Sequence, residues 1–190
     1  PIAMAEIFPG PPAEVVVVGD TEVKVLALEG GVLREHAAFP GPVVPGRLAL
    51  GDLDGDGLTD AVIADLARSI LLVYLLGPDG RLRDKPATLQ PGLFPTHLAV
   101  ADLDRDGKAD ILASSSGEND LSIFLAGETG GFAPPIRRSI ASAPEGIAVS
   151  DLDADGVEDI AVALRGSGEI LVLTGSGNGE WADSQRLFTV

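Results

Sequence analysis

The chain has 190 residues and a formal charge of −16, set by 29 acidic and 13 basic side chains, and it contains no cysteine. No basic stripe is present to meet phosphates, so nucleic-acid binding is disfavoured, and a disulfide framework is excluded. The apolar runs are short and interrupted by Gly, Asp and Pro, so no membrane-spanning segment is predicted. No signal peptide opens the chain at Pro1, and we expect either a processed protein or an excerpt.

The sequence divides into four repeats, which predict four similar structural units covering residues 1–46, 47–96, 97–145 and 146–190. Each repeat begins with a short alternating run, such as Leu48 and Leu50 around Ala49, which predicts a first strand. A second strand is predicted in the apolar run that follows an acidic loop, at residues 61–64, 111–113 and 160–163. Third strands are predicted at residues 23–28, 70–76, 121–125 and 170–173.

A glycine-rich turn follows each third strand and predicts a hairpin into a fourth strand. Leu33, Leu82, Phe132 and Trp181 occupy equivalent positions just after these turns, so Trp181 is expected to pack rather than to bind. Runs that are apolar on both faces indicate sheets covered on both sides. The predicted fold class is therefore all-β, a β-propeller of four-stranded antiparallel blades, with a β-solenoid as the alternative.

Three copies of one acidic loop recur 50 and 49 residues apart: DLDGDGLTD from Asp52, DLDRDGKAD from Asp102 and DLDADGVED from Asp151. Carboxylates stand at positions 1, 3, 5 and 9 of each loop and glycine stands at position 6, a spacing that wraps a hard cation in oxygen ligands. Ordinary turns are the alternative for any single copy. Three copies in register favour three bound calcium ions, which would bring the formal charge from −16 to −10.

The predicted calcium ligands are four side chains and one backbone carbonyl, at position 7, in each loop. They are Asp52, Asp54, Asp56, Leu58 and Asp60 in the first, Asp102, Asp104, Asp106, Lys108 and Asp110 in the second, and Asp151, Asp153, Asp155, Val157 and Asp159 in the third. In the first repeat the equivalent segment is EIFPGPPAE, which keeps Glu6 and Glu14 but has Phe8 and Gly10 at positions 3 and 5. This loop is predicted to bind no ion.

The motif DxDxDGxxD between two strands, followed by an apolar run and a glycine-rich hairpin, resembles the FG-GAP/VCBS repeats of integrin α-subunit propellers and of bacterial secreted and surface proteins. The resemblance covers essentially the whole chain and is weakest in the first repeat. It implies calcium at one face of a ring, with protein or carbohydrate partners at the opposite face or between blades. Such rings usually have about seven blades, whereas this chain has four repeats.

Four blades could form a closed ring, a piece of a larger ring, or a half-ring that pairs with another copy. A half-ring would expose apolar faces at its two ends, and we expect these around Ile2, Val16 and Val18 at one end. Ile170, Val172 and Leu187 would mark the other end.

The sequence favours an extracellular, calcium-stabilised module for protein–protein contact, adhesion or surface assembly, with a lectin as the alternative. Catalysis is not expected, because the two histidines lie in different repeats and the loop carboxylates are committed to metal. The chain has one Trp, one Tyr and six Phe, which leaves few aromatic side chains for stacking on sugars. Candidate contact residues follow the second strands: Arg68, Glu118, Asn119, Asp120 and Arg165.

Overall fold

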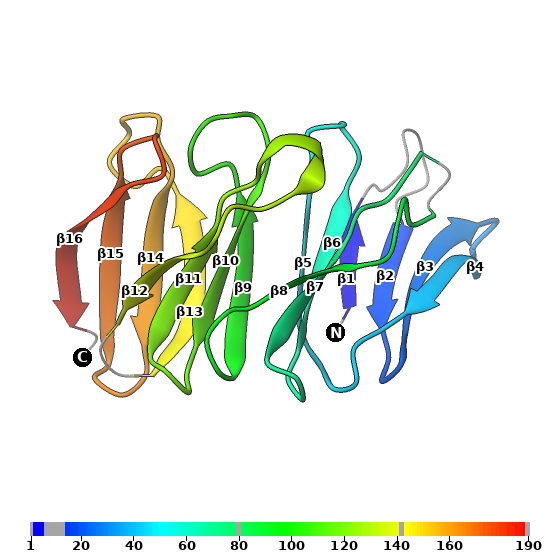
Figure 1. Ribbon diagram of the computed structural model, residues 1–190, viewed down its shortest axis with the longest axis horizontal. Helices are drawn as coiled ribbons and strands as arrows, with labels where there is room; N and C mark the ends of the chain where they lie inside the picture. Colours follow the sequence, from blue (N-terminus) through cyan, green and yellow to red (C-terminus); the bar gives the residue numbers. More distant parts are fainter. Residues whose placement is uncertain (1, 6–13, 79–80, 141–142, 189–190) are drawn as a thin grey trace. The chain divides into compact units, whose positions relative to one another are not determined.

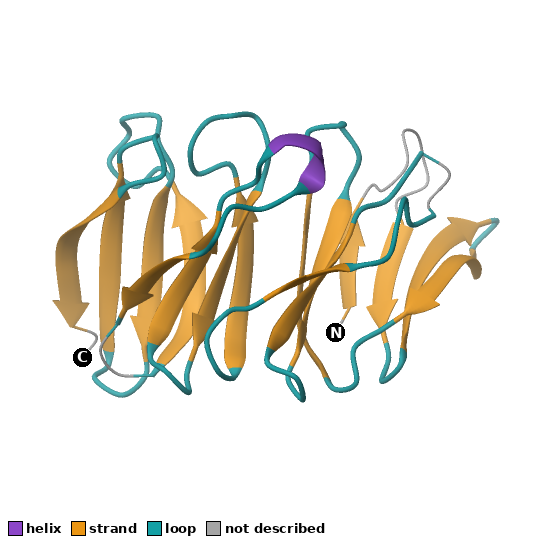
Figure 2. Cartoon of the chain, in the orientation of Figure 1, coloured by secondary structure: helices purple, strands orange, loops and turns teal. Residues whose placement is uncertain are grey.

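The computed structural model describes residues 2–5, 14–78, 81–140 and 143–188, and within them the chain is almost entirely β-strand (Figure 1). Sixteen strands form four antiparallel sheets of four strands each. The single helical element of the described residues is a 3-10 turn, η1 (Glu128–Gly130), and loops make up the remainder (Figure 2). The predicted all-β class with four-stranded antiparallel units is confirmed.

The chain separates into two compact units, residues 1–90 and 91–190, each with two sheets in which consecutive strands are neighbours. The first sheet of the first unit contains β1 (Ile2–Ala5), β2 (Glu14–Val18), β3 (Glu22–Glu29) and β4 (Val32–Pro40). Its second sheet contains β5 (Pro45–Gly51), β6 (Asp60–Asp65), β7 (Ile70–Tyr74) and β8 (Ala87–Leu89).

The second unit repeats this plan. Its first sheet contains β9 (Pro95–Ala101), β10 (Asp110–Ser115), β11 (Asp120–Phe124) and β12 (Ile136–Ser139). Its second sheet contains β13 (Pro144–Ser150), β14 (Asp159–Leu164), β15 (Glu169–Gly175) and β16 (Trp181–Phe188).

The core of the first unit lies between its two sheets. Val16 and Val18 of β2 belong to this core and are only 1% and 6% exposed, packed with Ile63 and Tyr74 of the second sheet. The expectation that these two valines lie on an exposed terminal face is therefore wrong. Side chains alternate along a strand, so burying Val16 and Val18 places Val15, not these two, on the opposite face. The side chain of Ile2 lies outside what the structure describes.

The core of the second unit joins β10 and β11 to β14 and β15. Leu112 and Ile123 pack there with Ile160 and Leu173, and Trp181 is buried in the same cluster, which confirms its expected packing role. Ile170 and Val172 alternate with buried leucines on β15 and remain partly exposed. The side chain of Leu187 is not described.

The pairing between the first and second strands is equivalent in all four sheets. The last residue of each first strand pairs with position 9 of its loop: Gly51 with Asp60, Ala101 with Asp110, and Ser150 with Asp159. In the first sheet Ala5 pairs with Glu14 in the same way. Glu14 is therefore the structural counterpart of the position-9 aspartates, and it is buried as they are.

Candidate metal centres

Each acidic loop is folded by its own first aspartate. The carboxylate of Asp52 accepts hydrogen bonds from the backbone N–H groups of Asp56 (3.1 Å) and Gly57 (2.8 Å). Gly57 has a φ of +81°, in the left-handed region that a residue without Cβ adopts at low cost. The second and third loops repeat the pattern, with Asp102 binding Gly107 N at 2.9 Å and Asp151 binding Gly156 N at 2.9 Å.

The aspartate at position 9 ties the loop to the end of the third strand. Asp60 is buried, and its two oxygens accept from Leu53 N (3.0 Å) and Leu76 N (2.8 Å). The equivalent bonds join Asp110 to Leu103 N (2.8 Å) and Ala126 N (2.7 Å), and Asp159 to Leu152 N (2.9 Å) and Gly175 N (2.9 Å). Because both oxygens are held by backbone groups, this carboxylate is fixed in place before any ion arrives.

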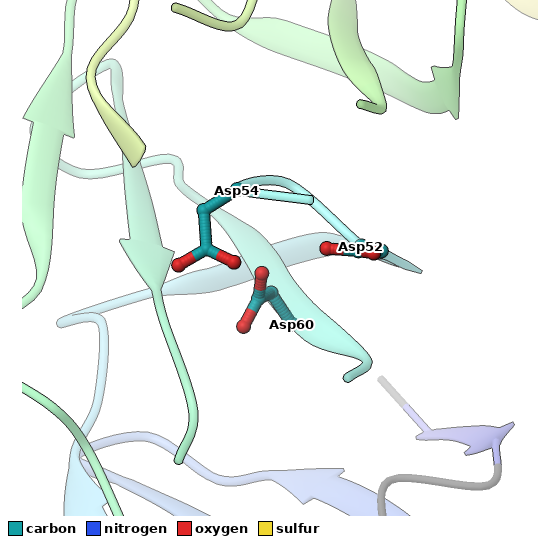
Figure 3. A group of neighbouring side chains, drawn as sticks. All are labelled: Asp52, Asp54 and Asp60. Carbon is teal, nitrogen blue, oxygen red and sulfur yellow. The ribbon is translucent and has the colours of Figure 1, made fainter. Parts of the chain in front are cut away.

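Three carboxylates converge in each loop, at positions 1, 3 and 9. Figure 3 shows Asp54 and Asp60 facing one another with Asp52 beside them. One oxygen from each lies within 4.8 Å of the others, as it does for Asp102, Asp104 and Asp110 and for Asp151, Asp153 and Asp159. Each of the three clusters could therefore hold a metal ion.

Burial and mutual repulsion make the first two clusters costly without a cation. Loss of hydration, with smaller contributions from the charges of Asp54 and Asp52, outweighs the backbone hydrogen bonds that lower the pKa of Asp60 and raises it to about 7. Burial likewise raises the pKa of Asp110 to about 6. A divalent ion would remove the repulsion, and a set of carboxylate oxygens alone fits a hard cation such as calcium.

The aspartates at position 5 do not join the converging groups. Asp56 accepts a hydrogen bond from Leu58 N (2.8 Å) through one oxygen, while the other contacts the guanidinium of Arg83. Asp106 accepts from Lys108 through both the backbone N–H (2.9 Å) and Nζ (2.5 Å). Burial opposes ionisation of Asp106, but the bonds from Lys108 outweigh it and lower its pKa.

In the third loop, one oxygen of Asp155 accepts a hydrogen bond from Val157 N at 2.8 Å. Ligation by position 5 and by the carbonyls of Leu58, Lys108 and Val157 stays a prediction. The role of Arg83 was missed in the sequence, where its only signal is a basic residue in a position that two other repeats fill with alanine.

In the first repeat, residues 6–13 lie outside the described part of the chain, so the predicted loss of the ion there stays a prediction. Of the five candidate contact residues, Arg68, Glu118, Asn119 and Arg165 are exposed as expected, and Asp120 is not. Asp120 is 7% exposed and pairs with Arg137 at 3.1 Å, and burial raises its pKa. Asp120 is therefore wrong as a surface contact, because its strand begins one residue earlier than predicted and turns this side chain inward.

The solved structures with folds similar to that of this chain are β-propellers, so its fold belongs to the β-propeller class. The chain is similar to a provisional 6-phosphogluconolactonase of Bacteroides fragilis (TM-score 0.69, 18% identity, 98% of this chain and 55% of that one). It is also similar to BBS1N in complex with ARL6DN (TM-score 0.67, 14% identity, 98% of this chain and 55% of that one). A third similar structure is a lectin of Agrocybe aegerita that recognises non-reducing terminal N-acetylglucosamine (TM-score 0.66, 17% identity, 96% of this chain and 50% of that one). The chain spans about half the length of these proteins, and no curated protein matches it.

A family model matches part of the sequence, within the second and third repeats. Residues 52–113 match the family model of the FG-GAP-like repeat, a stretch that contains the first two acidic loops. The resemblance to FG-GAP repeats that the loop motif suggested is confirmed over residues 52–113, and the fold of the chain is that of β-propeller blades.

Proposed function

We propose that the chain is a calcium-stabilised module of an extracellular β-propeller and that it binds a protein partner. The observation that carries the proposal is the convergence of three carboxylates in each acidic loop, one of which is buried and anchored to the third strand. An ion held there would join the loop to the body of its blade. Rigid loops on a rigid sheet are suited to presenting a binding surface, because little order has to be gained on contact.

Calcium would be held first by the aspartates at positions 1, 3 and 9 of each loop. The position-5 aspartates and the position-7 carbonyls would complete the coordination shell, giving three ions per chain. An ion that binds only the folded state stabilises it by about 2.7 kcal/mol at a hundredfold excess over its dissociation constant.

An extracellular location follows from the ion, since sites of the extracellular type bind calcium weakly and are filled where calcium is abundant. Among the described residues, none of the helical segments has the length and hydrophobicity that crossing a membrane would require.

A protein partner is favoured over a carbohydrate. The lectin of similar fold makes carbohydrate binding the second candidate, whereas the complex of BBS1N with ARL6DN is a protein–protein contact. Tyr74, Phe124 and Trp181 are buried, and Phe94, at 60% exposure, is the one large exposed aromatic side chain among the described residues. Stacking on sugar rings needs exposed aromatics, so the described surface offers little for it. The likeness to the provisional lactonase concerns the fold alone, and we propose no catalytic role.

Thermal unfolding of the whole chain in calcium and in chelator tests the proposal. Each filled site is expected to raise the melting temperature by about 5–10 °C at a hundredfold excess of calcium. Magnesium at equal concentration is the control, because it prefers fewer protein ligands and keeps more of its water. Identical melting curves in calcium and in chelator would contradict the metal assignment. A glycan array probed in calcium then distinguishes the lectin from the protein-binding module.

A further inference from the structure

The first acidic loop differs from the other two because a guanidinium occupies part of its ligand set. Nη1 of Arg83 lies 2.5 Å from Oδ2 of Asp54, which is one of the three converging carboxylates. Nη2 of the same guanidinium contacts Oδ2 of Asp56. Arg83 thus binds two neighbouring predicted ligands at once, and such two-point, charge-assisted contacts are the strong ones.

The position of Arg83 is fixed by the hairpin that follows the third strand. Its backbone N–H donates to the carbonyl oxygen of Leu75 at 3.0 Å. In the next blade the same bond runs from Ala133 to Leu125 at 2.9 Å, so Ala133 is the counterpart of Arg83. In the last blade the counterpart is Ala182, one residue after Trp181 in the same hairpin. Of the three acidic loops, the first therefore has this arginine, and the second and third have alanine in its place.

We infer that Arg83 is a built-in competitor of the divalent ion at the first loop, which makes this the weakest of the three sites. This inference rests on the proposed function, because it assumes that the loops bind calcium. An ion that enters the first loop must displace the guanidinium from Asp54 and Asp56, since two cations sharing the same oxygens repel one another. Ion binding at this loop is reduced by the free energy of the contacts that Arg83 gives up.

The second and third loops can be compared with the first by the cationic side chains that contact their carboxylates. In the second, Nζ of Lys108 forms its ion pair with Asp106, which is outside the converging group, and it acts on Asp104 through charge alone. In the third, position 7 is Val157, and none of the ion pairs among the described residues involves the loop. Nη2 of Arg105 lies 3.4 Å from the position that a Cβ on Gly156 would take, and no ion pair in the described part of the chain joins Arg105 to a carboxylate of the third loop. The expected order of affinity is third loop, then second, then first.

Without calcium, Arg83 supplies part of the stabilisation that the ion would give to the first loop. Its positive charge offsets two of the carboxylates and connects the loop to the hairpin at Leu75. The first loop therefore stays closed at calcium concentrations that leave it empty, and the protein responds to calcium in two stages rather than one.

Titration calorimetry with calcium on the full chain tests the inference. The variant Asp102→Ala/Asp151→Ala leaves only the first loop intact, and Arg83→Ala is added to it. Removing the guanidinium is expected to raise the calcium affinity of the first loop about tenfold or more, which is about 1.4 kcal/mol. The matched control is Arg34→Ala in the same background. It removes one positive charge from an exposed pair with Glu29 in the first sheet, a different blade from that of Asp52–Asp60, and is expected to change affinity less than about twofold.

A second measurement keeps the test independent of affinity. In chelator, Arg83→Ala is expected to lower the melting temperature relative to the unmodified chain, whereas in saturating calcium the two are expected to melt together. If Arg83→Ala does not fold, Arg83→Gln removes the charge and retains the length. An unchanged or weakened affinity of the first loop overturns the competitor role while calcium binding by the chain still supports the proposed function. Absence of calcium binding at all loops overturns both.

Discussion

Replacing Asp110 by alanine tests whether the position-9 carboxylate holds its blade together even when no ion is bound. Asp110 is fully buried and accepts from Leu103 N (2.8 Å) and Ala126 N (2.7 Å). The variant leaves two buried N–H groups without an acceptor, at about 1–3 kcal/mol each, so the expected loss is about 2–6 kcal/mol. Burial raises the pKa of Asp110 to about 6, so at pH 7 the variant also removes a disfavoured charge, which places the loss in the lower half of this range.

The assay is denaturant or thermal unfolding in chelator at pH 7, which separates this role from metal binding. A loss of 2–4 kcal/mol corresponds to about 4–16 °C in melting temperature for a chain of this size. Asp106→Ala is the matched control in the same loop, because the side chain of Asp106 bonds to Lys108 near the surface and is expected to contribute less than about 1 kcal/mol. Equal losses for Asp110→Ala and Asp106→Ala in chelator would refute the structural role of the buried carboxylate.

Three further predictions follow from the loops and the packing. Calcium affinity should fall as the pH drops, through about 7 at the first loop and about 6 at the second, because Asp60 and Asp110 bind protons there and the ion needs the ionised form. Calorimetry at pH 8 and pH 5.5 measures this, and an affinity that does not change with pH would contradict it. Anomalous scattering from calcium-soaked crystals should find three ions per chain, and a fourth ion at the first repeat would overturn the account of the degenerate loop. Gly175→Ala should destabilise the chain by about 1–3 kcal/mol, because the added methyl would overlap the carbonyl oxygen of Glu158, whereas Gly146→Ala has room and should be nearly neutral in the same denaturation assay.

The fold class could be predicted from the sequence because every repeat carries the same signals in the same order. Alternating runs, acidic loops and glycine-rich turns each predict a local structure, and four copies reinforce one another. Which face of β2 is buried could not be predicted. Its residues Glu14–Val18 include four consecutive valines, so no polar alternation indicates which valines are buried. The structure settles this through packing with the neighbouring sheet, where Val16 and Val18 are buried.

The converging aspartates could be predicted because their spacing along the loop determines where they meet. Positions 1, 3 and 9 do converge, as in Asp52, Asp54 and Asp60. The contacts of Asp56 and Asp106 could not be predicted in the same way. They depend on cations at the rim: Arg83 arrives from a hairpin 27 residues further along the chain, while Lys108 reaches across from position 7 of its own loop.

The burial of Glu14 at the position-9 site of the first blade has a consequence for how such repeats can diverge. The carboxylate at position 9 supports the blade and also belongs to the group that would surround an ion, whereas the carboxylates at positions 3 and 5 take no part in the bonds that anchor the loop to the third strand. A repeat can therefore discard the acids at positions 3 and 5 while keeping a buried acid at position 9, as the first repeat does in its sequence. Ion binding and blade architecture can change separately, so one propeller can carry strong, weak and absent calcium sites on sheets of the same design.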